Sequence, residues 1–298
     1  MPSLYRVCVL CLSSVFWLTV SANAEEDPEL IRSTLPGKKT KPTQNIVPNP
    51  APELVPAELG LRVGERLFYD IRVGGISVGN SFIEVQKTEN HGQDNGPMVW
   101  KVAMKTRSSR GFSLWHGIKD DAKSSIDVKA GFSRRFHIKK GEGDVRDEEE
   151  ISFIYDIDNT HAVSNRLRFD GQWRTKQVPL SGKHLDPLAA LYYLRAIDFT
   201  ILHDNNSIYL PICQDRRHWD LQIKVVGTSW EDFGEYKNRE CWMVVLPDPG
   251  FSGLFERKGT MKIWIDKLSR IPVKMTVEVP IGAAEVLLTE HSNSPLDK

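Results

Sequence analysis

The stretch Leu67-Phe-Tyr-Asp-Ile-Arg-Val73, followed at once by Gly74-Gly75, has the pattern that dominates this chain. Every second residue from Leu67 to Val73 is apolar, which is the period of a β-strand with one buried face. The two glycines suit a tight turn, and residues 76–85 have the pattern of the returning strand. The segment therefore predicts an antiparallel hairpin.

The same alternation recurs along most of the chain. Asp170-Gly171, between Leu167 and Trp173, predicts a second hairpin turn. Many short strands separated by polar turns are typical of antiparallel barrels, rolls and sandwiches. We expect a mainly β protein built as a curved antiparallel sheet or barrel-like β-roll. Further strand-like runs lie at residues 100–104, 151–155, 223–226, 241–246, 261–265, 273–279 and 284–288.

One segment departs from this pattern: His184-Leu-Asp-Pro-Leu-Ala-Ala-Leu-Tyr-Tyr-Leu-Arg195. Asp186 is a good N-cap for the backbone N–H groups of Leu188 and Ala189, and Pro187 suits the first helical position. The rest is apolar nearly all round, as in buried helices. We expect one central buried helix at about residues 186–197, packed on the concave face of the sheet. Arg195 is interpreted as a last-turn cation facing the helix dipole.

The N-terminus has the features of a bacterial Sec-type signal peptide over residues 1–24. Arg6 supplies the positive region, residues 7–20 are apolar, and Ala22-Asn23-Ala24 predicts cleavage after Ala24. The protein is therefore expected to be periplasmic or secreted, with no transmembrane span once the signal is removed.

Three further segments follow from composition. Residues 25–57 carry seven prolines and a lysine cluster, which predicts a Pro-rich disordered linker. Residues 58–291 form the expected β-rich domain, and residues 292–298 form a polar tail.

Signal cleavage removes Cys8 and Cys11 and leaves Cys213 and Cys241. Two cysteines in an oxidising compartment make this pair a disulfide candidate. The alternative is two buried free thiols, because sequence does not give the separation of their Cα atoms.

Several function classes are disfavoured. The 39 basic and 39 acidic side chains give a net charge of zero, which argues against nucleic-acid binding. The eight histidines include no pair at helical metal-ligand spacing, and no glycine loop is placed to hold phosphate. Gly250-Phe-Ser-Gly253 lacks the spacing of a nucleophile elbow. We therefore predict a non-enzymatic protein with no catalytic, cofactor-binding or metal-binding residues.

The acidic run at residues 144–150 lacks calcium-loop spacing and is interpreted as a solvated entry into a strand. Aromatic side chains suit either core packing or an apolar ligand on a concave sheet. Tyr192, Tyr193 and Trp264 are the candidate ligand-binding residues.

The chain resembles the DUF3108 family of exported bacterial proteins. The resemblance covers about residues 61–290 and lies in three groups of residues. The first contains Val63-Gly-Glu65, Tyr69, Gly75-Ile76 and Gly79, the second is the helical segment at residues 186–195, and the third contains Ile263-Trp-Ile-Asp266, Arg270, Pro272-Val273 and Gly282.

The closing pattern, at about residues 261–277, is also similar to LolA-like lipoprotein carriers of the cell envelope. That likeness implies a curved antiparallel sheet with a helix near its concave side, and a hydrophobic ligand. The DUF3108 resemblance supplies no catalytic residues.

These observations favour a non-enzymatic periplasmic cell-envelope protein that binds an apolar, lipid-like ligand. One alternative is a scaffold or assembly factor whose partner is an envelope protein. The other is a glycan-acting hydrolase, which would need a cleft with convergent carboxylates.

Overall fold

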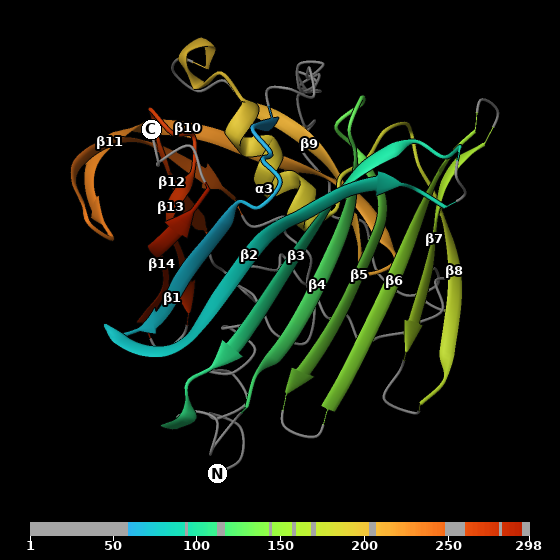
Figure 1. The fold of residues 1–298 in the computed structure, drawn as a ribbon, viewed down its shortest axis with the longest axis horizontal. Helices are drawn as coiled ribbons and strands as arrows, with labels where there is room; N and C mark the ends of the chain where they lie inside the picture. The colour runs from blue at the N-terminus through green and yellow to red at the C-terminus, as the bar shows by residue number, and fades with distance from the viewer. Residues whose placement is uncertain are drawn as a thin grey trace, which may run out of the picture.

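The strands of this protein form one antiparallel sheet (Figure 1). The computed structural model describes residues 59–92, 95–111, 117–142, 145–156, 159–167, 171–202, 207–247, 260–279 and 282–293. Within these residues the sheet has 14 strands in the order β8-β7-β6-β5-β4-β3-β2-β1-β14-β13-β12-β11-β10-β9. The strands are β1 (Arg66–Val73), β2 (Ile76–Asn90), β3 (Met98–Ser108), β4 (Lys119–Asp127), β5 (Ser133–Glu142), β6 (Val145–Tyr155), β7 (Thr160–Leu167), β8 (Trp173–Pro179), β9 (Ser207–Gln214), β10 (Arg217–Phe233), β11 (Tyr236–Leu246), β12 (Met261–Asp266), β13 (Pro272–Val279) and β14 (Gly282–Ser292).

The sheet consists of two meanders that meet where the first strand pairs with the last. Arg66 of β1 lies opposite Ser292 of β14, so the two ends of the domain lie side by side. Strands β8 and β9 are left as the two edges of the sheet. The chain between these edges contains helix α3 (Pro187–Ala196) and a short 3-10 helix, η2 (Phe199–Ile201). The predicted curved antiparallel sheet with a buried helix at about residues 186–197 is therefore confirmed, as an open roll.

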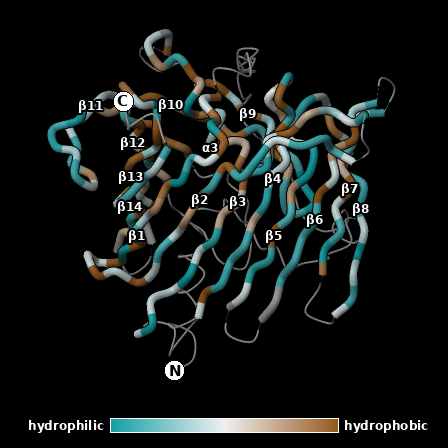
Figure 2. The backbone as a smooth tube through the Cα atoms, in the orientation of Figure 1, coloured by the Kyte–Doolittle hydropathy of each residue, from teal (hydrophilic) through white to brown (hydrophobic). Residues whose placement is uncertain are grey.

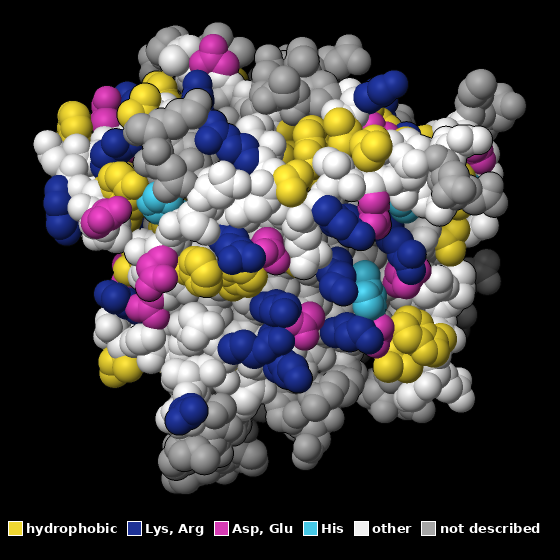
Figure 3. All heavy atoms as spheres, viewed as in Figure 1, with side chains coloured by type: hydrophobic (Ala, Val, Ile, Leu, Met, Phe, Trp, Pro, Cys, Tyr) yellow, Lys and Arg dark blue, Asp and Glu magenta, His cyan; other side chains and the backbone are white. Residues whose placement is uncertain are grey.

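The two faces of the sheet differ in polarity because side chains alternate along each strand. In β1, Leu67, Tyr69 and Ile71 are buried, as the sequence pattern predicted. Figure 2 shows apolar residues in most of the strands, and Figure 3 shows Lys, Arg, Asp and Glu interspersed over the face formed by β2 to β6. On that face Arg107 pairs with Asp121 at 2.6 Å. Such exposed pairs contribute little stability, so burial on the concave side drives folding.

Helix α3 begins as predicted. The Asp186 carboxylate accepts hydrogen bonds from the backbone N–H groups of Leu188 and Ala189 at 2.9 and 3.0 Å. Its other oxygen accepts from the hydroxyls of Ser124 and Ser133, both at 2.6 Å. One buried carboxylate therefore caps the helix and joins it to β4 and β5.

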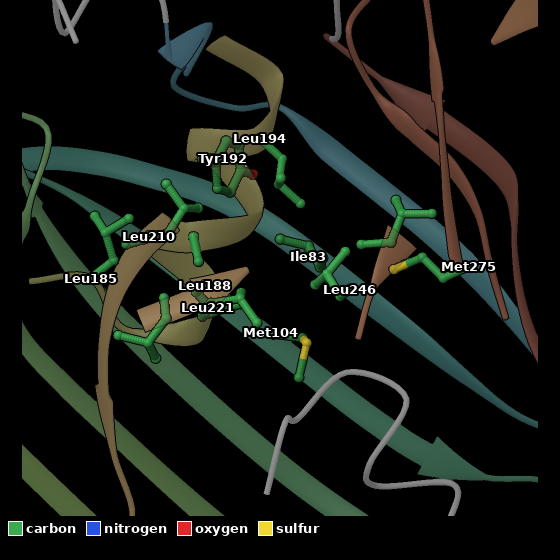
Figure 4. Packing of buried hydrophobic residues seen from close by; sticks show 14 of the residues in the cluster. Ile83, Met104, Leu185, Leu188, Tyr192, Leu194, Leu210, Leu221, Leu246 and Met275 are labelled. Carbon is green, nitrogen blue, oxygen red and sulfur yellow. The ribbon is translucent and has the colours of Figure 1, made fainter. Parts of the chain in front are cut away.

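The helix lies against the apolar face of the roll. Figure 4 shows Leu188, Tyr192 and Leu194 of the helix within a cluster of buried side chains drawn from both meanders. All three helix residues are buried, as expected for a helix that is apolar on most of its surface. Other labelled members of the cluster are Ile83, Met104, Leu185, Leu210, Leu221, Leu246 and Met275.

Strands β4 and β9 were not predicted, although Ile208, Leu210 and Ile212 alternate along β9 and are buried. In β4, the buried positions include Asp120 and Ser124, so the inward face is partly polar. Strand β9 contains Pro211, which lacks an N–H group and is tolerated at a sheet edge. The Pro211 carbonyl accepts from the N–H of Leu185, so the segment before α3 covers part of this edge.

The predicted disulfide is wrong in this structure. Cys213 and Cys241 are both buried free thiols. Cys213 lies opposite His218 of β10, whereas Cys241 lies opposite Ser229 of the same strand. At about 3.3 Å per residue these positions are roughly 36 Å apart along β10. A disulfide needs Cα atoms within about 7 Å, so the strand register keeps the two thiols apart.

Some predictions lie outside the described residues. The signal peptide, its cleavage after Ala24 and the Pro-rich linker fall in residues 1–58. The polar tail begins one residue later than predicted, since Ser292 is the last residue of β14. Within the described part of the chain, no helix combines the length and apolar character needed to cross a membrane.

Replacing Asp186 with alanine is expected to destabilise the fold by on the order of 3 kcal/mol, because a cap is lost and two buried hydroxyls lose their acceptor. Ser124→Ala should cost less, since the cap remains. Chemical denaturation of both variants measures the two losses. Equal losses would contradict a capping role for Asp186.

Candidate functional site

The C-terminal end of α3 is held by a buried ion pair. The Arg195 guanidinium donates to both carboxylate oxygens of Glu65, at 2.6 and 3.0 Å, and to the carbonyl of Gly60 at 3.2 Å. Burial lowers the pKa of Arg195, but the Glu65 carboxylate outweighs this effect and raises it. Arg195 is therefore more than the last-turn cation predicted, because it joins the helix to the start of β1.

One more contact joins this end of the helix to the β12–β13 turn, and a second joins β1 to β13 nearby. Arg270, in the β12–β13 turn, donates to the carbonyl of Ile197 at 2.9 Å. The hydroxyl of Tyr69, in β1, donates to the carbonyl of Pro272 at 3.0 Å. Many of the residues that carry the family resemblance are therefore anchors of the helix and its surroundings.

The structure does not bring the three candidate ligand-binding residues together. Tyr192 is fully buried, with the Arg195 guanidinium 5.0 Å from its ring centre. Tyr193 is partly buried and packs against the core. Trp264 alternates along β12 with the buried Ile263 and Ile265 and therefore lies on the opposite face of that strand.

On that opposite face, the Trp264 ring lies 4.7 Å from the ammonium of Lys274. Of the three candidates, Tyr192 is on the concave side and Trp264 is not. A shared ligand site for them is not supported.

A second polar feature lies where the β9–β10 turn docks on the concave face of β6 and β7. The Glu149 carboxylate accepts from the backbone N–H groups of Asp215 and Arg216, both at 3.0 Å, and from the Ser164 hydroxyl at 2.7 Å. Asp215 and Arg216 both have positive φ, at 49° and 61°, which orients their N–H groups toward this carboxylate. We call this contact the seam, formed by Glu149, Ser164 and Arg166 on one side and Gln214, Asp215 and Arg216 on the other.

The seam closes the roll without strand pairing. Among the described strands, β8 and β9 make no ladder with each other. The β9–β10 turn lies instead on β6 and β7, where it is held mainly by the Glu149 carboxylate, and Asp215 lies 3.6 Å from Arg166. Strand β9 is also joined to the segment before α3, because Leu185 makes backbone hydrogen bonds with Pro211 and Cys213. The turn itself is held by fewer hydrogen bonds than a paired strand, which has a row of them.

The electrostatics of the seam are unfavourable to a buried charge. Burial, together with the nearby Asp215, raises the pKa of Glu149 to about 7 against the opposing effects of Ser164 and Arg166. Arg166 is itself engaged by Asp147, with N–O distances of 3.0 and 2.6 Å. The Glu149 carboxyl group is therefore expected to gain or lose a proton near neutral pH.

Several buried polar atoms at the seam have no hydrogen-bond partner among the described residues. They are Nε2 and Oε1 of Gln214, Oδ2 of Asp215 and Nε of Arg216. An unsatisfied buried polar atom costs about 1 to 3 kcal/mol, so these groups lower the stability of the closed seam.

Sequence reasoning missed the seam. Residues 144–150 were interpreted as a solvated strand entry, but Glu149 is buried. The alternation held the necessary information, since Glu149 shares a face with Ile151 and Phe153. Nothing in the sequence indicated the turn at Asp215 and Arg216, because neither residue is a glycine or an asparagine.

The described residues contain no candidate metal-binding site. Nowhere in them do three or more His, Cys, Asp or Glu side chains lie close enough together to hold a metal ion.

The comparison with protein families matches the family described as "Protein of unknown function (DUF3108)" over residues 69–289. The chain belongs to the DUF3108 family. The match spans β1 to β14 and includes α3, so the resemblance in the sequence is confirmed. The search of curated proteins finds no match for this DUF3108 protein.

Two solved structures are similar to this DUF3108 protein. A β-barrel-like protein of the DUF1849 domain from Brucella abortus has a TM-score of 0.48 and 12% identity, covering 77% of this chain and 97% of that one. A DUF1329 family protein from Desulfovibrio piger has a TM-score of 0.24 and 9% identity, covering 80% and 87%.

Replacing Arg195 with methionine is expected to destabilise the protein by about 3 to 5 kcal/mol, because the Glu65 carboxylate is left buried without its partner. Adding Glu65→Gln should recover part of this loss. Urea denaturation of the two single variants and the double variant measures the coupling. Additive losses would show that the pair does not act as a unit.

Replacing Glu149 with glutamine is expected to change how stability depends on pH. The pKa of Glu149 in the folded protein, about 7, is above its ordinary value of 4.5, so its contribution is full below about 4.5 and is lost as pH rises through about 7. Glutamine cannot ionise, so the stability of the wild type relative to the variant should fall between acidic and mildly alkaline pH.

Denaturation at several pH values measures this difference. The matched control is Glu150→Gln, one residue along the same strand, where Glu150 pairs with Arg135 on the opposite face. A difference between wild type and Glu149→Gln that stays constant with pH would contradict the prediction.

Proposed function

We propose that this protein is a non-enzymatic protein of the bacterial cell envelope that binds an apolar, lipid-like ligand on the concave side of its sheet. The observation that carries the proposal is the seam. The roll encloses an apolar interior, and its β9–β10 turn is held on β6 and β7 mainly by the Glu149 carboxylate, which also accepts from Ser164. Separating that turn from β6 and β7 would expose the interior without breaking any strand pair.

The composition of the interior also supports an apolar ligand. Met104, Met261 and Met275 are buried and lie on β3, β12 and β13, and Figure 4 shows two of them in the core. Methionine is flexible and polarisable, and it adapts to cavities and ligands of varied shape. A core that repacks around methionines can accommodate an added chain at lower cost than one built of β-branched residues.

The helix anchors define the part of the interior that should stay fixed during opening. Asp186 joins the start of α3 to β4 and β5, and Arg195 joins its end to Glu65. Both anchors are buried. The start of α3 is joined to β9, because the Leu185 carbonyl accepts from the N–H of Cys213, one residue before the seam residue Gln214. An opening confined to the β9–β10 turn would leave this contact and α3 in place, with α3 as one wall of the ligand site.

The test is to restrain the seam chemically. In a background with Cys213→Ser and Cys241→Ser, Ser164→Cys and Asp215→Cys are joined by a short bifunctional thiol reagent. Uptake of a fluorescent fatty acid should slow by about tenfold or more after crosslinking, which corresponds to a barrier higher by about 1.4 kcal/mol. The same variant without the reagent should bind as the parent does.

A matched control crosslinks a pair that is already held together. Lys123 and His137 lie opposite each other on β4 and β5, so Lys123→Cys with His137→Cys bridges strands that need not separate. Unchanged uptake in the seam variant would contradict opening at the seam. Protein purified from its native envelope without co-purifying lipid would contradict the ligand itself.

The envelope location has its own test. Protein recovered from the periplasm should begin at Glu25, because cleavage is expected after Ala24. N-terminal sequencing reads this directly, and a chain that retains Met1 in the cytoplasm would contradict the proposed location.

An assembly factor is the second candidate, and one observation favours it. Trp173 begins the edge strand β8 and its side chain is 53% exposed. An exposed aromatic residue on an unpaired edge suits a protein partner that adds a strand. Trp173→Ala should then abolish periplasmic crosslinks to a reproducible partner while leaving fatty-acid uptake unchanged.

A glycan-acting hydrolase is less well supported. A raised carboxyl pKa is typical of catalytic acids. Both oxygens of Glu149 are however occupied by the β9–β10 turn and Ser164, which accounts for the residue structurally.

A further inference from the structure

A pocket lies far from the seam along the sheet, where the β10–β11 hairpin meets β14. It encloses about 370 Å³, within the range of small-molecule sites. It is lined by Phe233, Gly234, Glu235, Tyr236, Leu288, Thr289, Glu290 and His291.

The pocket is formed by a close approach between strands that are not neighbours in the sheet. Gly234 has φ +53°, and a Cβ atom there would lie 2.9 Å from the Thr289 carbonyl oxygen. Any larger residue would push the hairpin away from β14. The Tyr236 hydroxyl and Nε2 of His291 are 2.8 Å apart and hydrogen-bond across the same gap. The hairpin is therefore fixed on β14 at two points.

Aromatic rings form one side of the pocket. The ring centres of Phe233 and Tyr236 are 5.5 Å apart, and those of Tyr236 and His291 are 5.4 Å apart. Phe233 is buried, whereas Tyr236 and His291 are only partly covered. The π faces of such rings attract organic cations.

The charged residues of the pocket are acidic. Glu235 and Glu290 are both exposed, and the lining residues include no lysine or arginine. Two cations lie on the hairpin near Tyr236 in the chain. Lys237 pairs with Asp232 at 3.5 Å, and the Arg239 guanidinium lies 5.6 Å from the Tyr236 ring centre. Arg239 is engaged by Asp266 through two hydrogen bonds, at 2.9 and 2.8 Å. Its charge is therefore compensated, and the pocket is left with two carboxylates.

We propose that this pocket binds a small organic ammonium ion. Aromatic faces attract the cation, and the two carboxylates compensate its charge. An anionic ligand would be repelled by Glu235 and Glu290. A neutral apolar ligand would leave both negatively charged carboxylates next to an apolar group, with no compensating charge. The site borders the core through Phe233 and Leu288, and the proposal does not depend on the function proposed above.

Titration of the mature protein with choline, followed by NMR or calorimetry, tests the site. Binding in the millimolar range is expected, with shifts confined to the β10–β11 hairpin and the end of β14. Glu235→Gln with Glu290→Gln should weaken binding by about tenfold or more, equal to about 1.4 kcal/mol. Both carboxylates are exposed, so these substitutions should leave the fold intact.

Two controls separate this site from general charge effects. Glu285→Gln changes a carboxylate on β14 outside the pocket and should leave choline affinity unchanged. The uncharged analogue of choline, with carbon in place of nitrogen, should bind at least about tenfold more weakly. The proposal would be overturned if the analogue bound as tightly as choline. It would also be overturned if Glu285→Gln weakened choline binding as much as Glu235→Gln with Glu290→Gln. Absence of any choline-dependent shift in the hairpin would overturn it as well.

Discussion

A helix placed on the concave side of a rolled sheet must have its polar ends satisfied where little water reaches them, and the rest of this structure depends on how that is done. Asp186 accepts the first free N–H groups of α3 and the hydroxyls of Ser124 and Ser133. Arg195 binds the Glu65 carboxylate at the other end. These contacts fix α3 against β4 and β5 at its start and against the residue before β1 at its end.

The same principle explains why the roll is left open. Strands β8 and β9 do not pair, so the sheet is closed by a turn whose N–H groups reach a single buried carboxylate. The helix anchors are well satisfied, whereas the seam contains buried polar atoms without partners in the described residues. Stability is therefore uneven along the molecule, with a fixed helix at one place and a weaker closure at another. Uneven stability of this kind is what a protein needs if it is to admit a ligand without unfolding.

Contacts between residues close together in the sequence could be predicted, whereas contacts between residues far apart in the sequence could not. The capping contact of Asp186 spans two or three residues and was predicted with its partners Leu188 and Ala189. The Glu65–Arg195 pair spans 130 residues, and Arg195 was interpreted only as a charge at a helix end. The disulfide failed for the same reason, because Cys213 and Cys241 are separated by the register of β10. Of the candidate ligand residues, Tyr192 lies on the concave side of the sheet because α3 is buried there. Trp264 lies on the other side because of the alternation along β12.

By itself, the sequence determined the β-rich class, the single helix with its cap, the hairpin at Gly74-Gly75 and the family. All of these depend on residue periodicity, turn chemistry or motifs that lie close together along the chain. Only the tertiary structure decided that Glu65 meets Arg195, that Glu149 holds the β9–β10 turn, and that Gly234 brings a hairpin against β14. Each of these contacts joins segments that the sheet order brings together, and no local pattern records that order. The burial of Glu65 had no distinguishing mark in the sequence, whereas that of Glu149 was marked only by its alternation with Ile151 and Phe153.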